Sequence, residues 1–172
     1  MNDQRASITA ELKLTLANSR SSGDALILQV LELLVRNLRG TWGAYWIEDK
    51  KSGLLRFNQD WHISNFDVTG LDGNLKQRTF ESGEGMPGIV WRMKRAEWSR
   101  DIIKDMMLPR SLRAHNLGLD AGMWIPVIDK NNIFGVIEIL GHRNELLTNG
   151  LAQFLQSIGE EVGHRLASGF ES

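Results

Sequence analysis

A carboxylate, Glu138, interrupts the apolar run VIEIL. Because an unpaired buried charge is costly, this side chain must either face solvent or find a partner. Arg110 and Arg113 are candidate partners, and so is a donor group of a bound ligand. Alternation with Ile137 and Ile139 fits a solvent-facing carboxylate equally well, so the pattern leaves both interpretations open.

Glycines and a proline crowd the stretch GEGMPGIVW, which begins at Gly83. The spacing of Gly83, Gly85 and Gly88 fits the dinucleotide-binding pattern G-x-G-x-x-G, but no preceding strand and no downstream ribose acid accompany it. The P-loop pattern is not matched. Glycine permits turns that other residues resist, and Pro87 presets φ for a helix start. The stretch therefore predicts a turn into a helix, whose N–H groups could still hold an anion.

Six tryptophans are a high number for 172 residues. Core packing best explains any one of them, but several together can line a pocket for a flat ligand. Four of them lie on predicted elements near the middle of the chain: Trp46, Trp91, Trp98 and Trp124. The four histidines, His115 among them, show no metal-binding helix spacing, so we predict no metal site. Any of them could ligate haem iron, although a solvated histidine is the simpler interpretation.

The sequence offers no convincing enzyme site. It contains no G-x-S-x-G, no paired-carboxylate motif and no cysteine. The lack of cysteine excludes disulfides, thiolate metal sites and thioether-linked cofactors, and agrees with a reducing compartment such as the cytoplasm. A net charge of -1 gives no reason to expect a nucleic-acid partner. The most apolar run, ALILQVLELLV, is too short and too polar for membrane insertion.

Periodicity predicts an α+β domain with two hairpins. Helices are expected over residues 4–17, 24–38, 108–118 and 145–167, and strands over 43–49, 54–63, 98–102, 120–129 and 133–141. Residues 75–82 are ambiguous. Two hairpins indicate an antiparallel sheet with helices on one or both faces. Gly159 and Gly163 lie inside the last helix and remove bulk from one side, which would permit close packing within the domain or across a dimer.

Several of these motifs together resemble the GAF domain family. The similar pattern consists of the loop G-x-G-[LM]-P-G-x-V-W, a later tryptophan and aspartate (Trp98 and Asp101), an arginine-containing helix ending at Gly118 and Leu119, a P-V strand, and G-V-x-E ending at Glu138. The strand GAYWIED and the final helix are also similar to family elements. The resemblance covers roughly residues 24–167, with residues 1–22 as a helical extension of one domain over 1–172.

The resemblance implies an antiparallel sheet of five or six strands. The terminal helices would lie on one face, and an irregular loop and helix segment would cover a ligand pocket on the other, with the Gly-Pro-Gly segment in its lid and wall. The lack of cysteine excludes covalent bilin attachment and the thiol chemistry of the family's free methionine sulfoxide reductases. No cyclic-nucleotide signature N-K-x-F-D-E is present. The cofactor is left unknown, with haem or another small molecule as candidates.

Together with this resemblance, the sequence predicts a non-enzymatic sensory or regulatory domain, as in bacterial signal-transduction proteins of the two-component or chemotaxis type. It would bind a small molecule, signal through its terminal helices, and form a homodimer through them. The ligand-binding residues expected are Tyr45, Trp46, Trp91, Trp98, Arg110, His115, Trp124 and Glu138. Arg110 would pair with an anion and the tryptophans would stack on the ligand. The alternative is a structural dimerisation module without a ligand.

Overall fold

The computed structural model describes residues 2–21, 23–106 and 109–169. Positions 1 and 22 of the predicted N-terminal extension, and Leu108 at the start of the helix predicted for 108–118, lie outside the described residues.

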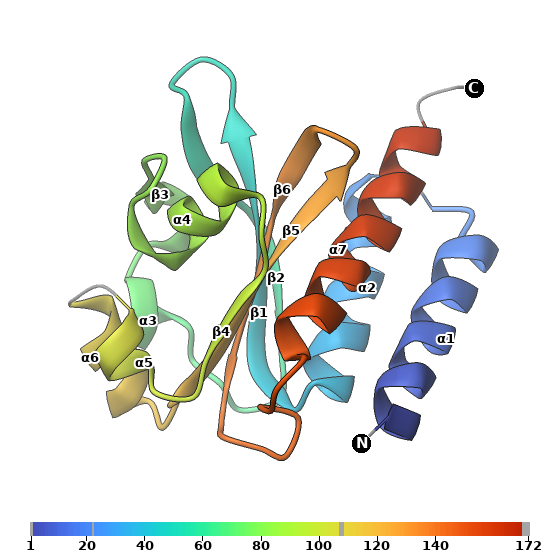
Figure 1. Ribbon diagram of the computed structural model, residues 1–172. Coiled ribbons are helices and arrows are strands. Elements are labelled where there is room, and N and C mark those ends of the chain that lie inside the picture. The colour runs from blue at the N-terminus through green and yellow to red at the C-terminus, as the bar shows by residue number, and fades with distance from the viewer. Residues whose placement is uncertain (1, 22, 107–108, 170–172) are drawn as a thin grey trace.

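The centre of the molecule is an antiparallel sheet of six strands in the order β3-β2-β1-β6-β5-β4 (Figure 1). Their bounds are Gly40–Asp49 (β1), Leu54–His62 (β2), Thr79–Phe80 (β3), Glu97–Ser99 (β4), Ala121–Asp129 (β5) and Asn132–Gly141 (β6). The two predicted hairpins, β1-β2 and β5-β6, join through the pairing of β1 with β6. This arrangement confirms the predicted fold class.

Three long helices cover one face of the sheet: α1 (Asn2–Asn18), α2 (Asp24–Asn37) and α7 (Leu151–Ser168). α2 packs on β1 and β2, α7 packs on β5, and α1 lies outside them against both α2 and α7. The other face carries the irregular cover, which we define as the described parts of residues 63–120 that lie outside the strands β3 and β4. Its short helices are α3 (Thr69–Asp72), η1 (Leu75–Gln77), α4 (Gly85–Met93), α5 (Ile102–Asp105) and α6 (Arg110–Asn116).

Side chains alternate between the two faces and form two separate cores. Tyr45 and Ile47 of β1 belong to the core under the long helices, where Ile8 and Leu12 of α1 also lie. Trp46, between Tyr45 and Ile47 in the chain, belongs to the core under the irregular cover. The face that a strand residue occupies therefore decides whether it packs against the long helices or against the cover.

Several predicted boundaries differ from the structure; β1, for example, begins at Gly40 and not at residue 43. The last helix begins at Leu151, not at residue 145, because Gly150 before it has a φ of 83° and a loop precedes it. β4 ends at Ser99 because Asp101 caps α5, its carboxylate accepting from the Lys104 N–H at 3.3 Å. The ambiguous residues 75–82 form η1 and the short strand β3.

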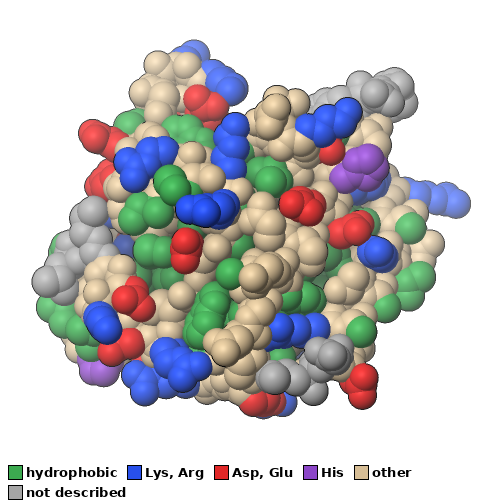
Figure 2. All heavy atoms as spheres, viewed as in Figure 1, with side chains coloured by type: hydrophobic (Ala, Val, Ile, Leu, Met, Phe, Trp, Pro, Cys, Tyr) green, Lys and Arg blue, Asp and Glu red, His purple; other side chains and the backbone are tan. Residues whose placement is uncertain are grey.

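On the face shown in Figure 2, acidic and basic side chains are interspersed.

None of the helices in the described part of the chain combines the length and the apolar character that crossing a bilayer requires.

Gly159 and Gly163 allow α7 to lie directly on the backbone of β5. A Cβ atom at Gly159 would collide with the carbonyl oxygen of Pro126, and one at Gly163 would collide with that of Ile128. The close packing that these glycines permit therefore lies inside the domain, between a helix and a strand. Neither carbonyl is the far end of a flexible side chain, so neither can move away easily.

We expect Gly159→Ala to destabilise the protein by about 2 kcal/mol or more, because overpacking against backbone outweighs the roughly 1 kcal/mol that alanine contributes to a helix. Urea denaturation of Gly159→Ala measures this, with Glu160→Ala on the exposed side of the same helix as control. A Gly159→Ala variant as stable as the native protein would contradict the packing described here.

Candidate functional site

Three buried residues from three neighbouring strands form the base of the site. Trp46 on β1, Trp124 on β5 and Glu138 on β6 are each fully buried on the face under the cover. Trp124 is the cross-strand partner of Glu138. The indole N–H of Trp46 donates to Oε1 of Glu138 at 3.3 Å, and that of Trp124 donates to Oε2 at 2.7 Å. The sheet thus presents a carboxylate that is oriented by one tryptophan on each side.

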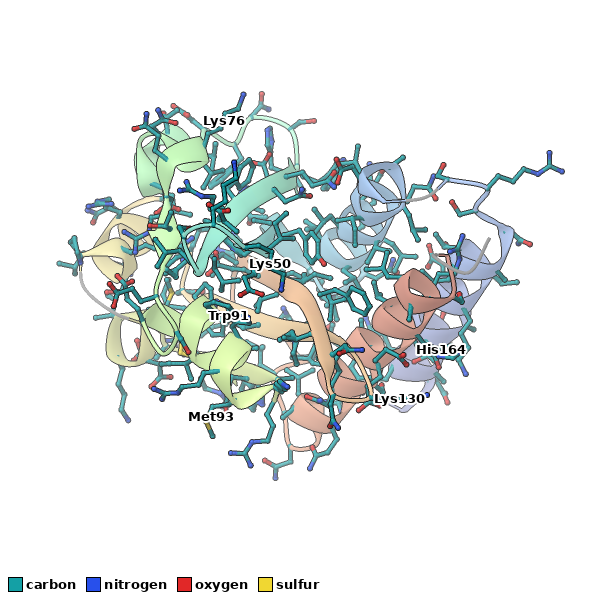
Figure 3. All side chains as sticks on the ribbon, turned by 90° about the horizontal axis from the view of Figure 1, so that it is seen from above. Lys50, Lys76, Trp91, Met93, Lys130 and His164 are labelled. Carbon is teal, nitrogen blue, oxygen red and sulfur yellow. The ribbon has the colours of Figure 1, made fainter. Side chains whose placement is uncertain are left out.

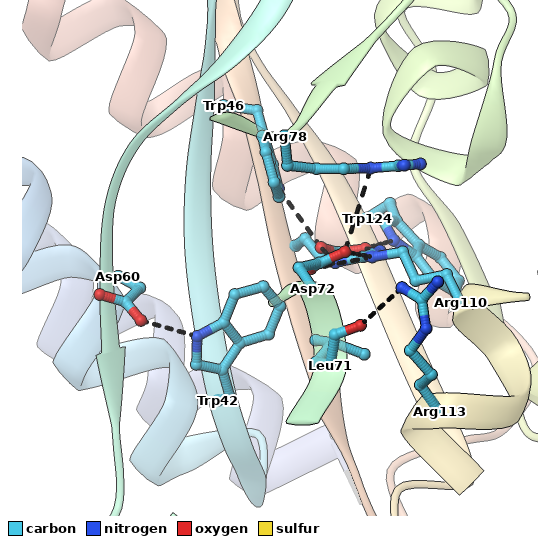
Figure 4. A network of polar contacts seen from close by, with 10 residues as sticks. Trp42, Trp46, Asp60, Leu71, Asp72, Arg78, Arg110, Arg113 and Trp124 are labelled. Atoms are coloured by element: carbon cyan, nitrogen blue, oxygen red, sulfur yellow. Dashed lines mark hydrogen bonds and ion pairs between the residues drawn. The ribbon is translucent and has the colours of Figure 1, made fainter. Parts of the chain in front are cut away.

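Arg110, the first residue of α6, completes the hydrogen bonding of Glu138 (Figure 4). Its Nη1 donates to Oε2 at 2.7 Å and its Nη2 donates to Oε1 at 2.6 Å. Such bidentate pairs combine strength with fixed orientation. Of the two interpretations left open for Glu138, the structure therefore supports the buried and paired one, with Arg110 as the partner.

A second carboxylate, Asp72 at the end of α3, binds the other edge of the same guanidinium. Nε of Arg110 donates to Oδ1 at 2.9 Å, and Nη2 donates to Oδ2 at 3.0 Å. The Asp72 side chain is 1% exposed. Arg110 is consequently held between a carboxylate of the sheet and a carboxylate of the cover.

Aromatic rings enclose the buried guanidinium. Its Cζ lies 5.9 Å from the ring centroid of Trp42, 5.8 Å from that of Trp46 and 5.5 Å from that of Phe80. These distances fall in the range of cation–π contacts. Burial by itself lowers the pKa of Arg110, but the charges and hydrogen bonds of Glu138 and Asp72 outweigh it and raise that pKa above its ordinary value. The guanidinium is therefore a permanent cation.

Two further arginines lie at the rim. Arg78 stacks over Phe80 with its Cζ 4.5 Å from the ring centroid, and its Nε lies 3.9 Å from Oδ1 of Asp72. That Nε is buried and has no hydrogen-bond partner in the described part of the chain. Arg113 donates from Nη1 to the carbonyl oxygen of Leu71 at 3.2 Å.

A cavity of about 30 Å³ lies beside this network. Its lining includes the three arginines, Phe80, and the first turn of α4 from Gly85 to Pro87. The volume is that of about one water molecule. The glycine-rich stretch thus forms part of the wall, as the resemblance implied, and the site is closed in this structure.

The structure brings together four of the eight predicted site residues: Trp46, Arg110, Trp124 and Glu138. Trp91 of α4, labelled in Figure 3, is half-buried and packs against the apolar core that contains Trp46 and Trp124. His115 is exposed on α6 and is not among the hydrogen-bond partners of Glu138 and Arg110 described above. Whether any of the eight contacts a ligand stays a prediction.

Tyr45 and Trp98 lie on the opposite face of the sheet from this cluster, contrary to expectation. Tyr45 precedes Trp46, and consecutive strand residues point to opposite faces. Tyr45 packs in the helix-side core, where burial and then the charge of Asp24 raise its pKa above the ordinary range. Trp98 pairs with Met123 and packs against the same helix-side core.

Sequence reasoning missed Asp72, Trp42 and Phe80. Trp42 could have been found, since it lies four residues before Trp46 on one strand and therefore shares its face. Asp72 gave no such signal, because Asp72-Gly73 has the composition of a turn and its partner lies far along the chain.

Comparison with known proteins identifies the family and supports the fold. The family profile described as GAF domain matches residues 21–167. No curated protein sequence matches the chain. The GAF domain of A. aeolicus nlh2, solved in an inactive state, has a TM-score of 0.74 at 15% identity, with 98% of each chain covered.

Two further solved structures show the range of proteins that share this fold. The free methionine-R-sulfoxide reductase of Neisseria meningitidis, in complex with its substrate, has a TM-score of 0.73 at 12% identity, covering 97% of this chain and 90% of that one. The GAF domain of an Acinetobacter phosphoenolpyruvate-protein phosphotransferase has a TM-score of 0.67 at 12% identity, covering 98% and 93%. At these identities the similarity concerns the fold.

We expect Arg110→Met to destabilise the protein by about 3–5 kcal/mol, because it leaves Glu138 and Asp72 buried without their cation. Arg36→Met is the matched control, since Arg36 pairs with Glu32 on the exposed surface of α2 and its loss should cost less than about 1 kcal/mol. Urea denaturation compares the two. Equal losses would show that the buried network does not hold the cover to the sheet.

Proposed function

Because the chain belongs to the GAF domain family, we propose that it is a non-enzymatic regulatory domain that binds a small molecule between the sheet and the irregular cover. The observation that carries this proposal is the buried network of Arg110, Glu138 and Asp72. Replacing a buried ion pair with well-packed apolar residues is often neutral or stabilising, so stability alone gives little reason for this network. A few oriented polar groups in an aromatic pocket are typical of ligand sites.

The chemistry of the site favours binding over catalysis. The chain has no cysteine, so it lacks a thiol nucleophile. The two buried carboxylates, Asp72 and Glu138, both accept hydrogen bonds from Arg110. They are thereby occupied as acceptors, which suits recognition of a ligand better than general base catalysis.

The sheet offers a direct route from the ligand site to the long helices. Glu138 and Trp124 face the cover, while their strand neighbours Ile137 and Ile125 belong to the core under α2 and α7. α7 rests on the backbone of β5 at Gly159, so a shift of β5 would move this helix. A ligand drives such a change only if it binds one arrangement better than the other.

We place this domain in a cytoplasmic signal-transduction protein of the two-component or chemotaxis type, as a homodimer paired through its terminal helices. Leu14 on α1 and Leu28 on α2 are 63% and 42% exposed, so each of these helices presents an apolar side chain that such a contact could bury. A cysteine-free sequence suits a reducing cytoplasm.

The second candidate function is a structural dimerisation module without a ligand. The cavity of about 30 Å³ favours it, because the pocket is filled by the protein's own aromatic side chains. For the regulatory function the cover must open to admit a ligand. The two candidates therefore differ in whether any small molecule stabilises the protein.

A thermal-shift screen of nucleotides, haem, bilins, amino acids and small organic acids tests the proposal. A ligand at 100 times its Kd should stabilise the native protein by about 2.7 kcal/mol. Trp124→Phe should weaken the effect, because it reduces the aromatic surface and removes the N–H that orients Glu138. Trp98→Phe is the control, since Trp98 lies on the opposite face.

Two results would contradict the proposal. If no compound in the screen raises the melting temperature, the structural module is supported instead. If Trp98→Phe weakens binding as much as Trp124→Phe does, the ligand lies elsewhere on the molecule.

A further inference from the structure

The two carboxylates that bind Arg110 are held in different ways. Glu138 lies in the middle of β6 and accepts from two strand tryptophans as well as from Arg110. Asp72 lies at the last position of the four-residue helix α3, between two connecting segments of the cover. Gly73 follows it with a φ of 62°, so the chain turns away directly after the carboxylate. Glu138 is thus part of the sheet, whereas Asp72 belongs to the short helix α3, a separate element from the helix that carries Arg110.

The hydrogen bonds of Asp72 have the geometry that a free carboxylate adopts on an arginine. The two oxygens of the planar Asp72 carboxylate accept hydrogen bonds from Nε and Nη2 of Arg110 at 2.9 and 3.0 Å. This side of the guanidinium is free for a ligand once Asp72 moves, because Nη1 and Nη2 keep their bonds to Glu138. A planar carboxylate matches this edge bidentately.

The charges around the cavity also favour an incoming anion. Arg78, Arg110 and Arg113 line it, and the carboxylates that accompany them are Asp72 and Glu138. If Asp72 withdrew, three cations would face one carboxylate. The buried Nε of Arg78, which has no hydrogen-bond partner among the described residues, and the N-terminal turn of α4 would both favour the anion.

We propose that Asp72 occupies the place of a ligand carboxylate, and that the site binds a small organic carboxylate in exchange for it. This inference rests on the proposed function and names the class of its ligand. The carboxylate binds the Nε and Nη2 edge of Arg110, and the apolar body of the ligand lies among Phe80, Met86 and Met106 beside it.

The exchange gives the ligand a way to change the conformation of the cover. When Asp72 leaves, α3 moves with it, and the bond from Arg113 to the carbonyl of Leu71 is lost. The fully buried side chain of Leu71 is then drawn from the cover-side core. Binding is thereby coupled to a rearrangement that a ligand under a rigid cover would not produce.

Titration with sodium acetate tests the exchange, because acetate reproduces the side chain that Asp72→Ala removes. We expect acetate to raise the melting temperature of Asp72→Ala in a saturable manner. The native protein should need at least about tenfold more acetate, since its own carboxylate competes for the site. Sodium chloride at equal ionic strength and acetamide, the neutral isostere, should leave Asp72→Ala unchanged.

A second variant keeps the test decisive if Asp72→Ala does not fold. Asp72→Asn retains the shape and one acceptor but lacks the charge, so acetate should displace it at a severalfold lower concentration than in the native protein. Adding Arg78→Gln to either variant should weaken acetate binding. In the native protein, amide hydrogen exchange in α3 should become faster when acetate binds and displaces Asp72.

Three outcomes would overturn the inference: acetate acts no better than acetamide or chloride, the native protein and both Asp72 variants respond equally, or inorganic phosphate stabilises the variants while acetate does not. If acetate fails but the wider screen finds a neutral or cationic ligand that Trp124→Phe weakens, the proposed function stands and the exchange alone is wrong.

Discussion

The burial of one guanidinium between two carboxylates is the interaction on which this site depends. Arg110 joins α6 to β6 through Glu138 and to α3 through Asp72, so it connects the sheet with two parts of the cover. Each group is costly to bury alone and acceptable only with the others. The indoles of Trp46 and Trp124 complete the bonding of Glu138 and orient its carboxylate toward the guanidinium.

A single layer of strands separates this polar site from an apolar core of different character. Neighbouring residues on each central strand serve the two sides, as Glu138 and Ile137 do on β6. The long helices pack on the sheet along much of their length, and the glycines of α7 allow that helix to contact the backbone of β5. The cover consists of short helices joined by loops, and such segments open at lower free energy than core helices and strands.

The motifs that were informative in the sequence are those whose local pattern carries a physical requirement. A charge inside an apolar strand requires a partner, and the sequence offers Arg110 and Arg113 as candidates, of which the structure selects Arg110. Pro87 and its glycines required a turn and a helix start, which α4 provides. Aromatic residue type was a weaker indicator of the site. Tyr45 and Trp98 are aromatic, but they lie on the face of the sheet opposite the site.

The sequence by itself determined what depends on neighbours along the chain: the strand and helix periods, the hairpin turns, and the absence of thiol chemistry. Only the tertiary structure decided which distant groups meet. Asp72 and Arg110 are far apart in sequence, yet their atoms lie 2.9 Å apart. The glycine at position 159 is required because the Pro126 carbonyl of β5 lies against it, and the periodicity of the helix does not reveal that contact. The physical reason is that hydrogen bonds and steric contact act over a few ångströms in space, and the path of the chain between two residues is set by the packing of the whole domain.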